Sequence, residues 1–223
     1  MNILVIVAHS DDETIGLGAT IKKHILLGDS VSVVSMTDGV TSRTKNLSSE
    51  PILRAESARA ASEILGFNWL EQYDFKDNEM DDYPLLAIVK SIEKLKLTFN
   101  PDIIYTHSNA DLNIDHRVVM QAVLTAFRPQ PHENYSEIRL FEVPSATDYG
   151  SPSVTGVFEP NLFINISDTW DAKEAALQAY TSEMREYPHS RSLGAIKNLA
   201  KIRGNQAGLQ MAEAFQVIRK IER

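Results

Sequence analysis

Two short polar stretches of the sequence carry residue types that bind metal ions and move protons. The first, residues 8–13, reads A-H-S-D-D-E and holds one histidine and three carboxylates. The second, residues 111–117, reads D-L-N-I-D-H-R. Imidazole and carboxylate groups are ligands of catalytic zinc, which keeps one coordination position open for water or substrate. Together the two stretches predict a metal centre that activates water.

The expected ligands are His9, Asp12 and His116. His9 and Asp12 lie three residues apart, so one tight turn can aim both side chains at a single point, and His116 supplies the third ligand from the second stretch. Zinc is the first expectation, although iron(II) oxygenases use the same ligand types, so Fe²⁺, Co²⁺ or Mn²⁺ also fits. Asp11 is not needed to hold the ion. We predict that it acts as the general base that takes a proton from the activated water, which makes the protein a hydrolase.

Each polar stretch follows a short apolar run that reads as a buried strand. These runs, residues 3–7 and 101–106, are rich in β-branched side chains, as strands buried on both faces of a parallel sheet should be. In an open parallel sheet, ligands bind at the carboxyl ends of the strands. If these two strands are neighbours, His116 lies close to His9 and Asp12.

The remaining pattern alternates strands and helices. Further strands are expected at residues 31–36, 69–70, 138–143 and 162–166, and helices at 12–27, 51–65, 85–95, 118–127 and 169–182. This alternation predicts an α/β fold with a doubly wound, mostly parallel sheet and helices on both faces. The segment 202–221 mixes helical spacing with alternation, so its type stays open.

Length and composition predict a single domain over residues 1–223. The chain has a net charge of −8, which argues against nucleic acid as a partner and favours a small-molecule substrate. It has no cysteine, which excludes a disulfide framework and a thiolate nucleophile. We expect no signal peptide and no membrane span, and therefore a cytoplasmic enzyme. A homo-oligomer is possible, but no sequence pattern marks an interface.

Residues 8–13 closely resemble the A-H-P-D-D-E signature of the LmbE-like, or PIG-L, family of metal-dependent N-deacetylases. Asp115-His116-Arg117 resembles the second motif of that family, commonly H-P-D-H, and weaker likenesses occur at residues 37–39, 54–66, 180–183 and 203–215. The resemblance implies a Rossmann-like fold and removal of an acetyl group from a 2-acetamido sugar, such as an N-acetylglucosamine conjugate. It also implies zinc at His9, Asp12 and His116, with Asp11 as the general base.

The sequence departs from the family pattern at two positions. Ser10 replaces the usual proline. This replacement should not change the direction in which the expected ligands His9 and Asp12 point. Asn113 stands where many members have the first histidine of H-P-D-H, which is thought to stabilise the oxyanion. Asn113 can donate a hydrogen bond but cannot carry a proton, and His107 could take the place of that histidine. Asp115 is then expected to orient a ligand or the loop.

Three residues are expected on the substrate side of the site. They are Asp38, which ends a strand, Arg54, which opens a helix, and His107. For Arg54 an ion pair with Glu56 that only supports the structure fits equally well. Two rival functions stay open: an iron(II) oxygenase with the same ligands, and a metal-stabilised sugar-binding protein that has lost its activity, which the presence of Asn113 favours.

Overall fold

The predicted α/β fold is confirmed by a computed structural model, which describes residues 1–37, 39, 50–131 and 133–222. The described strands are β1 (Asn2–Val7), β2 (Ser30–Thr37), β3 (Asn68–Phe75), β4 (Ile103–His107), β5 (Glu137–Phe141), β6 (Leu162–Asn165) and β7 (Ala212–Lys220). The described helices are α1 (Asp12–Leu26), α2 (Glu50–Leu65), α3 (Leu85–Leu95), α4 (Ile114–Ala126), α5 (Pro152–Thr155), α6 (Trp170–Ala179) and α7 (Leu193–Gln206), with a 3₁₀ turn at Met80–Asp82. None of these helices is long and apolar enough to cross a membrane.

All seven strands form one sheet in the order β3-β2-β1-β4-β5-β7-β6. β1 pairs in parallel with both β2 and β4, and Ile3 lies opposite Ile103. The strand order reverses direction between β1 and β4, which is the point where ligands bind in open α/β sheets. The two strands that precede the polar stretches are therefore neighbours, as the ligand prediction required.

The segment that the sequence left open contains the end of α7 and then β7. β7 runs antiparallel to both β5 and β6, so the sheet is parallel only from β3 to β5. β3 is also longer than the two residues expected at 69–70. It is the edge strand, and exposed polar side chains such as Glu71 interrupt the apolar pattern that marks the central strands.

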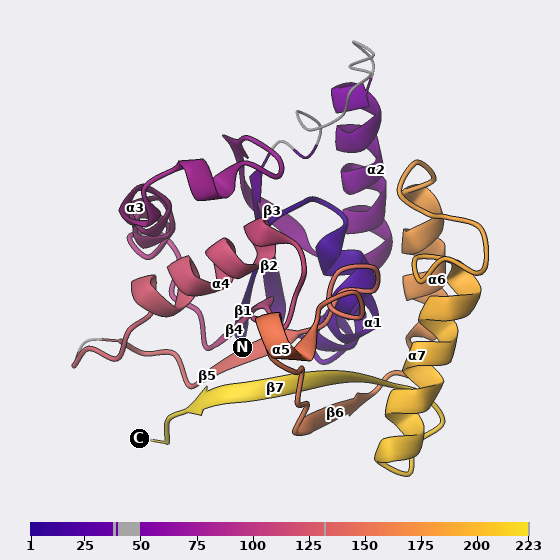
Figure 1. Cartoon of the computed structure of the whole chain (residues 1–223). Coiled ribbons are helices and arrows are strands. Elements are labelled where there is room, and N and C mark those ends of the chain that lie inside the picture. Colours follow the sequence, from indigo (N-terminus) through magenta and orange to yellow (C-terminus); the bar gives the residue numbers. More distant parts are fainter. Residues whose placement is uncertain (38, 40–49, 132, 223) are drawn as a thin grey trace.

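Helices cover the sheet on both faces. α1, α2, α6 and α7 lie on one side, and α3 and α4 lie on the other (Figure 1). Alternate residues of β1 pack into the two cores: Ile3 and Val5 contribute to the first, and Leu4 and Ile6 to the second. Burial on both faces explains why this strand reads as an uninterrupted apolar run. It also fixes the end of β1 as a rigid support for the polar turn that follows.

Gly16 of α1 packs directly against the end of β5. A Cβ at this position would lie 2.4 Å from Cδ2 of Phe141 and 3.1 Å from the carbonyl oxygen of Glu142. We expect Gly16→Ala to lower the free energy of unfolding by about 1–3 kcal/mol through overpacking, measured by urea denaturation. Gly194→Ala in α7 is the control, because nothing lies within 4 Å of its Cβ. Equal stability of the two variants would contradict this explanation.

Candidate metal centre

The turn between β1 and α1 folds the Asp12 carboxylate back towards His9. The amide of His9 donates to Oδ2 of Asp12 over 2.9 Å, and the amide of Asp11 donates to the carbonyl of His9 over 3.0 Å. The side chains of His9 and Asp12 are both buried. The turn thus places an imidazole and a carboxylate side by side at the carboxyl end of β1.

His116 reaches the same point from the first turn of α4. This helix is capped by Asn113, whose side-chain oxygen accepts the amides of Asp115 over 2.8 Å and of His116 over 3.4 Å. His116 is fully buried. Because β4 lies beside β1, the helix that follows β4 begins next to the β1 turn and brings its imidazole against His9.

Three ligand atoms converge at this point: Nδ1 of His9, Oδ2 of Asp12 and Nε2 of His116. They are separated by 3.2, 3.3 and 3.3 Å. The far nitrogens of the rings face other carboxylates, Nε2 of His9 at 3.1 Å from Asp115 and Nδ1 of His116 at 3.0 Å from Asp111. When both rings are neutral, as metal binding requires, these carboxylates accept their protons on the far side. Two imidazole lone pairs then face a carboxylate oxygen with no proton between them, which suits a metal cation.

The electrostatics of the cluster favour added positive charge. Burial lowers the pKa of His116, but Asp12 and Asp111 outweigh it and raise the pKa to about 9. Burial raises the pKa of Asp12, but His116 and His9 overcome this effect and hold it well below its ordinary value. In addition, zinc bonds of about 2.0–2.1 Å in a tetrahedral arrangement keep ligand atoms about 3.4 Å apart, close to the separations seen here. The donor set and its spacing therefore fit a divalent cation.

A second group of His9, Asp77 and Asp115 also lies within metal-binding distance. However, Oδ2 of Asp115 already accepts the amide of Asn78 over 2.7 Å, and Oδ1 accepts the amide of Met80 over 3.1 Å. Nε2 of His9 lies 3.0 Å from Oδ1 of Asp77. These carboxylates orient the ring of His9 and secure the loop after β3, as carboxylates behind a metal ligand commonly do.

Asp11 lies beside the ligand cluster and between two arginines. Oδ1 accepts a hydrogen bond from Nη2 of Arg54 over 3.2 Å, and Oδ2 accepts one from Nη1 of Arg191 over 3.2 Å. Arg54 also donates to Glu183 over 3.0 Å. Burial raises the pKa of Asp11, and the two arginines oppose this shift without cancelling it. A carboxylate of raised pKa, fixed in direction, is suited to accept a proton.

A cavity of about 180 Å³ opens over these groups. Apart from one glycine, only polar or charged side chains line it: His9, Asp11, Gly39, Arg54, Asp77, Asn78, Asn113, Glu183 and Arg191. Hydrogen-bonding groups on every wall suit a ligand rich in oxygen and nitrogen atoms. The ligand cluster, the carboxylate of Asp11 and the space for a ligand thus occur together at the edge of the sheet.

Asn113 and Asp115 have different surroundings. Asn113 lines the cavity, but its side-chain oxygen caps α4 and its Nδ2 donates to Oδ1 of Asn78 over 3.3 Å. Asp115 is fully buried, lies 3.1 Å from Nε2 of His9 and does not line the cavity. Of these two residues, only Asn113 lies where its side chain can face a ligand in the cavity.

His107 requires a correction. It was expected on the substrate side, but it is fully buried and does not line the cavity. Its Nε2 accepts the amide of Ala8 over 2.8 Å, and its ring stacks on that of His116 with centroids 3.9 Å apart. β4 ends at His107, so the side chain packs against the back of the ligand cluster. Asp38, the other expected substrate residue from a strand end, lies outside the described residues.

Four polar cavity residues were not among the predicted site residues: Asp77, Asn78, Glu183 and Arg191. Asp77 stands in an acidic loop that reads as solvated, and Glu183 belongs to one of the weaker family-like segments. Arg191 carried no signal, because its ion pair with Asp11 joins residues 180 positions apart. Contacts of this kind arise from tertiary packing and leave no periodic pattern.

Comparison with known proteins relates the whole chain to deacetylases and to a hydratase. A diacetylchitobiose deacetylase of Thermococcus kodakarensis is 26% identical over 97% of this chain and 82% of its own length. A 4-oxalmesaconate hydratase of Pseudomonas putida is 27% identical over 81% of this chain and 73% of its own length. The solved structure of N,N'-diacetylchitobiose deacetylase from Pyrococcus horikoshii shares the fold, with a TM-score of 0.80 at 21% identity over 98% of this chain and 84% of that one.

The family comparison covers both strands that position the ligand cluster. The sequence pattern described as PIG-L: GlcNAc-PI de-N-acetylase matches residues 4–127, more than half of the chain. This span contains the turn after β1 and the start of α4, and therefore all three expected ligands. The chain thus belongs to the PIG-L: GlcNAc-PI de-N-acetylase family.

Proposed function

We propose that this protein is a metal-dependent hydrolase that removes the N-acetyl group from a 2-acetamido sugar, such as an N-acetylglucosamine conjugate, glycoside or nucleotide sugar. The observation that carries the proposal is the convergence of His9, Asp12 and His116 beside Asp11 at the wall of a polar cavity. Family membership and the deacetylase relative support the same reaction.

His9, Asp12 and His116 would hold the metal ion, for which zinc is our first assignment and Fe²⁺, Co²⁺ or Mn²⁺ the alternatives. A bound zinc ion supplies Lewis acidity and lowers the pKa of water to about 7. Asp111 and Asp115 keep the two imidazoles turned so that their lone pairs face the ion.

Proton transfer falls to Asp11 in this proposal. Its carboxylate takes a proton from the attacking water while Arg54 and Arg191 hold its two oxygens in place. Asp11 then returns the proton to the leaving amine, because Asn113 has no proton of suitable acidity to give. The free N–H of the Asn113 amide, at the cavity wall, is assigned to the developing oxyanion.

The same proposal treats residues 1–223 as one catalytic unit. Arg191 and Glu183 lie beyond the span of the family pattern, yet both contact the groups around Asp11. The partner is a small amino-sugar compound, since a net charge of −8 argues against nucleic acid. We place the enzyme in the cytoplasm, and a homo-oligomer is compatible with it.

An acetate-release screen tests the proposal. Purified protein with added zinc is incubated with N-acetylglucosamine conjugates and nucleotide-linked acetamido sugars, and acetate and free amine are both quantified. Equal amounts of acetate and amine are expected. A parallel incubation with unsaturated di- and tricarboxylates follows loss of the conjugated double bond, because one relative is a hydratase. Hydration without any acetate release would overturn the deacetylase assignment, and tight sugar binding without turnover would favour an inactive binding protein.

Replacing Arg191 should weaken catalysis while sparing the metal centre. We expect Arg191→Met to lower kcat by about 10–100-fold, because the lost donor leaves the Asp11 carboxylate held from one side only. Zinc stoichiometry should not change. Arg185→Met in the same segment is the control, since among the described residues the Arg185 guanidinium donates only to the carbonyls of Ser182 and Met184. Equal effects of the two substitutions would argue against a role for Arg191 at Asp11.

A further inference from the structure

Helix α1 is broken close to the turn that carries the metal ligands. Leu17, inside the helix, has φ −143° and ψ 22°, outside the helical region. The break interrupts the normal bonding of the helix, in which each amide donates to the carbonyl four residues earlier. The carbonyl of Ile15 and the amides of Ala19 and Thr20 therefore need other partners in a buried region.

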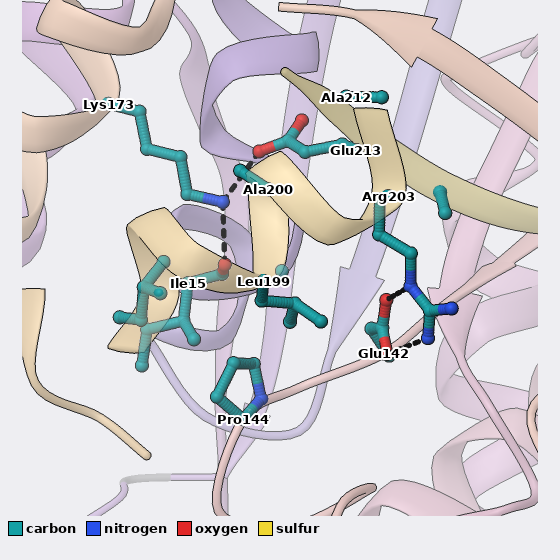
Figure 2. A pocket seen from close by; sticks show the side chains of 12 residues that line it. Ile15, Glu142, Pro144, Lys173, Leu199, Ala200, Arg203, Ala212 and Glu213 are labelled. Carbon is teal, nitrogen blue, oxygen red and sulfur yellow. Dashed lines mark hydrogen bonds and ion pairs between the residues drawn. The ribbon is translucent and has the colours of Figure 1, made fainter. Parts of the chain in front are cut away.

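Two charged side chains supply these partners from far along the chain. The Lys173 ammonium, from α6, donates to the carbonyl of Ile15 over 2.7 Å. The Glu213 carboxylate, from β7, accepts the amide of Ala19 over 3.1 Å and the amide of Thr20 over 2.7 Å. Lys173 and Glu213 also form an ion pair of 2.6 Å, and both line a small cavity of about 20 Å³ that is separate from the one over Asp11 (Figure 2). The carbonyl of Ile15 and the amides of Ala19 and Thr20 are thus each bonded to a charge of the favourable sign.

The charges match the polarity of the two helix ends. Glu213 lies at the amino end of the segment after the break, where the helix dipole favours negative charge, and Lys173 lies at the carboxyl end of the segment before it. Their side chains are 5% and 3% exposed, so neither charge is screened by water. A buried pair of this kind contributes little net stability compared with an apolar pair, but it fixes geometry.

The break separates the front of α1 from the rest of the helix. The front segment begins with Asp12 directly after Asp11, and Gly16 lets it approach Phe141 closely. The rear segment packs in the core between β1 and the outer helices. The direction of the front segment determines how Asp12 is oriented towards His9. That direction depends on the contacts that fix the two helical segments at the break.

We propose that Lys173 and Glu213 are positioning residues for the metal centre: by closing the break in α1 they set the direction of the segment that carries Asp11 and Asp12. This inference rests on the proposed metal site. It assigns a role in that site to α6 and β7, both outside the span of the family pattern. Neither residue touches the cavity over Asp11.

The double variant Lys173→Met/Glu213→Gln tests the proposal. Replacing both partners leaves no unpaired buried charge, and the glutamine oxygen still accepts one of the two amides, so the fold should persist. Zinc affinity is measured by competition with a chromophoric chelator, which does not depend on any substrate. We expect zinc to bind about tenfold more weakly, in the range seen when groups supporting a metal ligand are lost. Hydrogen exchange at the Thr20 amide should become faster in the same variant.

The matched control is Arg203→Met/Glu142→Gln. This pair lines the same cavity and forms two hydrogen bonds of 2.7 Å, but it makes no hydrogen bond to α1 (Figure 2). Its loss should leave zinc affinity and Thr20 exchange unchanged. Wild-type zinc affinity in a folded Lys173→Met/Glu213→Gln protein would overturn the proposal, as would failure of that variant to fold, since the pair would then support the whole fold. Absence of zinc binding by the wild-type protein would instead refute the metal site.

Discussion

The substitution Asp11→Asn should lower kcat for amide hydrolysis by about 10²–10⁴-fold, the usual contribution of a general base. Asparagine keeps the size of the side chain and one oxygen that can accept from Arg54 or Arg191, but it cannot take a proton from water. None of the three converging ligand atoms belongs to Asp11. Metal stoichiometry and the unfolding transition should therefore stay near those of the wild type, and acetate release under saturating zinc is the measurement.

Ser10→Ala provides the control for this prediction. The Ser10 hydroxyl accepts a hydrogen bond from Nε of Arg54 over 3.2 Å, so its removal disturbs the same arginine without touching the carboxylate. A change in kcat of no more than about tenfold, or about 1.4 kcal/mol, is expected, because Arg54 keeps its hydrogen bond to Asp11. Substantial turnover by Asp11→Asn would show that another group accepts the proton. Loss of metal from the same variant would place Asp11 among the ligands.

The sequence was sufficient to predict that His9, Asp12 and His116 come together, because the stretch that holds them follows a recognisable strand in each case. The apolar run before His9 and the one before His116 identify two strand ends, and parallel sheets align such ends at one edge. The spacing of His9 and Asp12 then needed only a tight turn. Local pattern and general rules of sheet topology were enough, without knowledge of any side-chain contact.

The surroundings of Asp11 could not be predicted in the same way. Arg191 and Glu183 come from the connection between α6 and α7, where no periodic pattern indicates which way a side chain points. For His107 the sequence did predict a place on the substrate side, and the structure does not place it there. It stands at a strand end like His9, yet its ring points to the back of the cluster and stacks on His116. Side-chain direction at a strand end depends on local twist and packing, which sequence spacing does not encode.

The broken helix illustrates a further limit. Residues 12–27 read as one continuous helix, and nothing in their sequence marks Leu17 as non-helical. Gly16 and Gly18 flank the break. Lys173 and Glu213 bond to backbone groups on either side of the break from α6 and β7. Glu213 belongs to the segment whose type the sequence left open, and Lys173 belongs to a predicted helix whose partners the sequence did not indicate.

Removal of His116 should abolish stable metal binding. His116→Ala deletes one of three converging ligand atoms and leaves Asp12 and Asp111 without the imidazole that lies between them. We expect the loss of zinc affinity to exceed the roughly 10–100-fold loss that is typical when a residue that hydrogen-bonds to a metal ligand is replaced. Zinc content after dialysis and chelator competition are the measurements. Asp111→Asn should lower zinc affinity by only about 10–100-fold, because it weakens the hydrogen bond that orients the His116 ring and leaves the ligand atom in place.

His24→Gln is the control that separates the loss of zinc affinity from the loss of stability that follows when any buried histidine is replaced. His24 is also buried, with Nδ1 at 2.7 Å from Asp29 and Nε2 at 3.0 Å from the Tyr105 hydroxyl, but it lies at the far end of α1. Its replacement should lower stability without changing zinc affinity. Full zinc stoichiometry in His116→Ala would remove His116 from the ligand set. Equal losses in His116→Ala and Asp111→Asn would mean that His116 acts as a support rather than as a ligand.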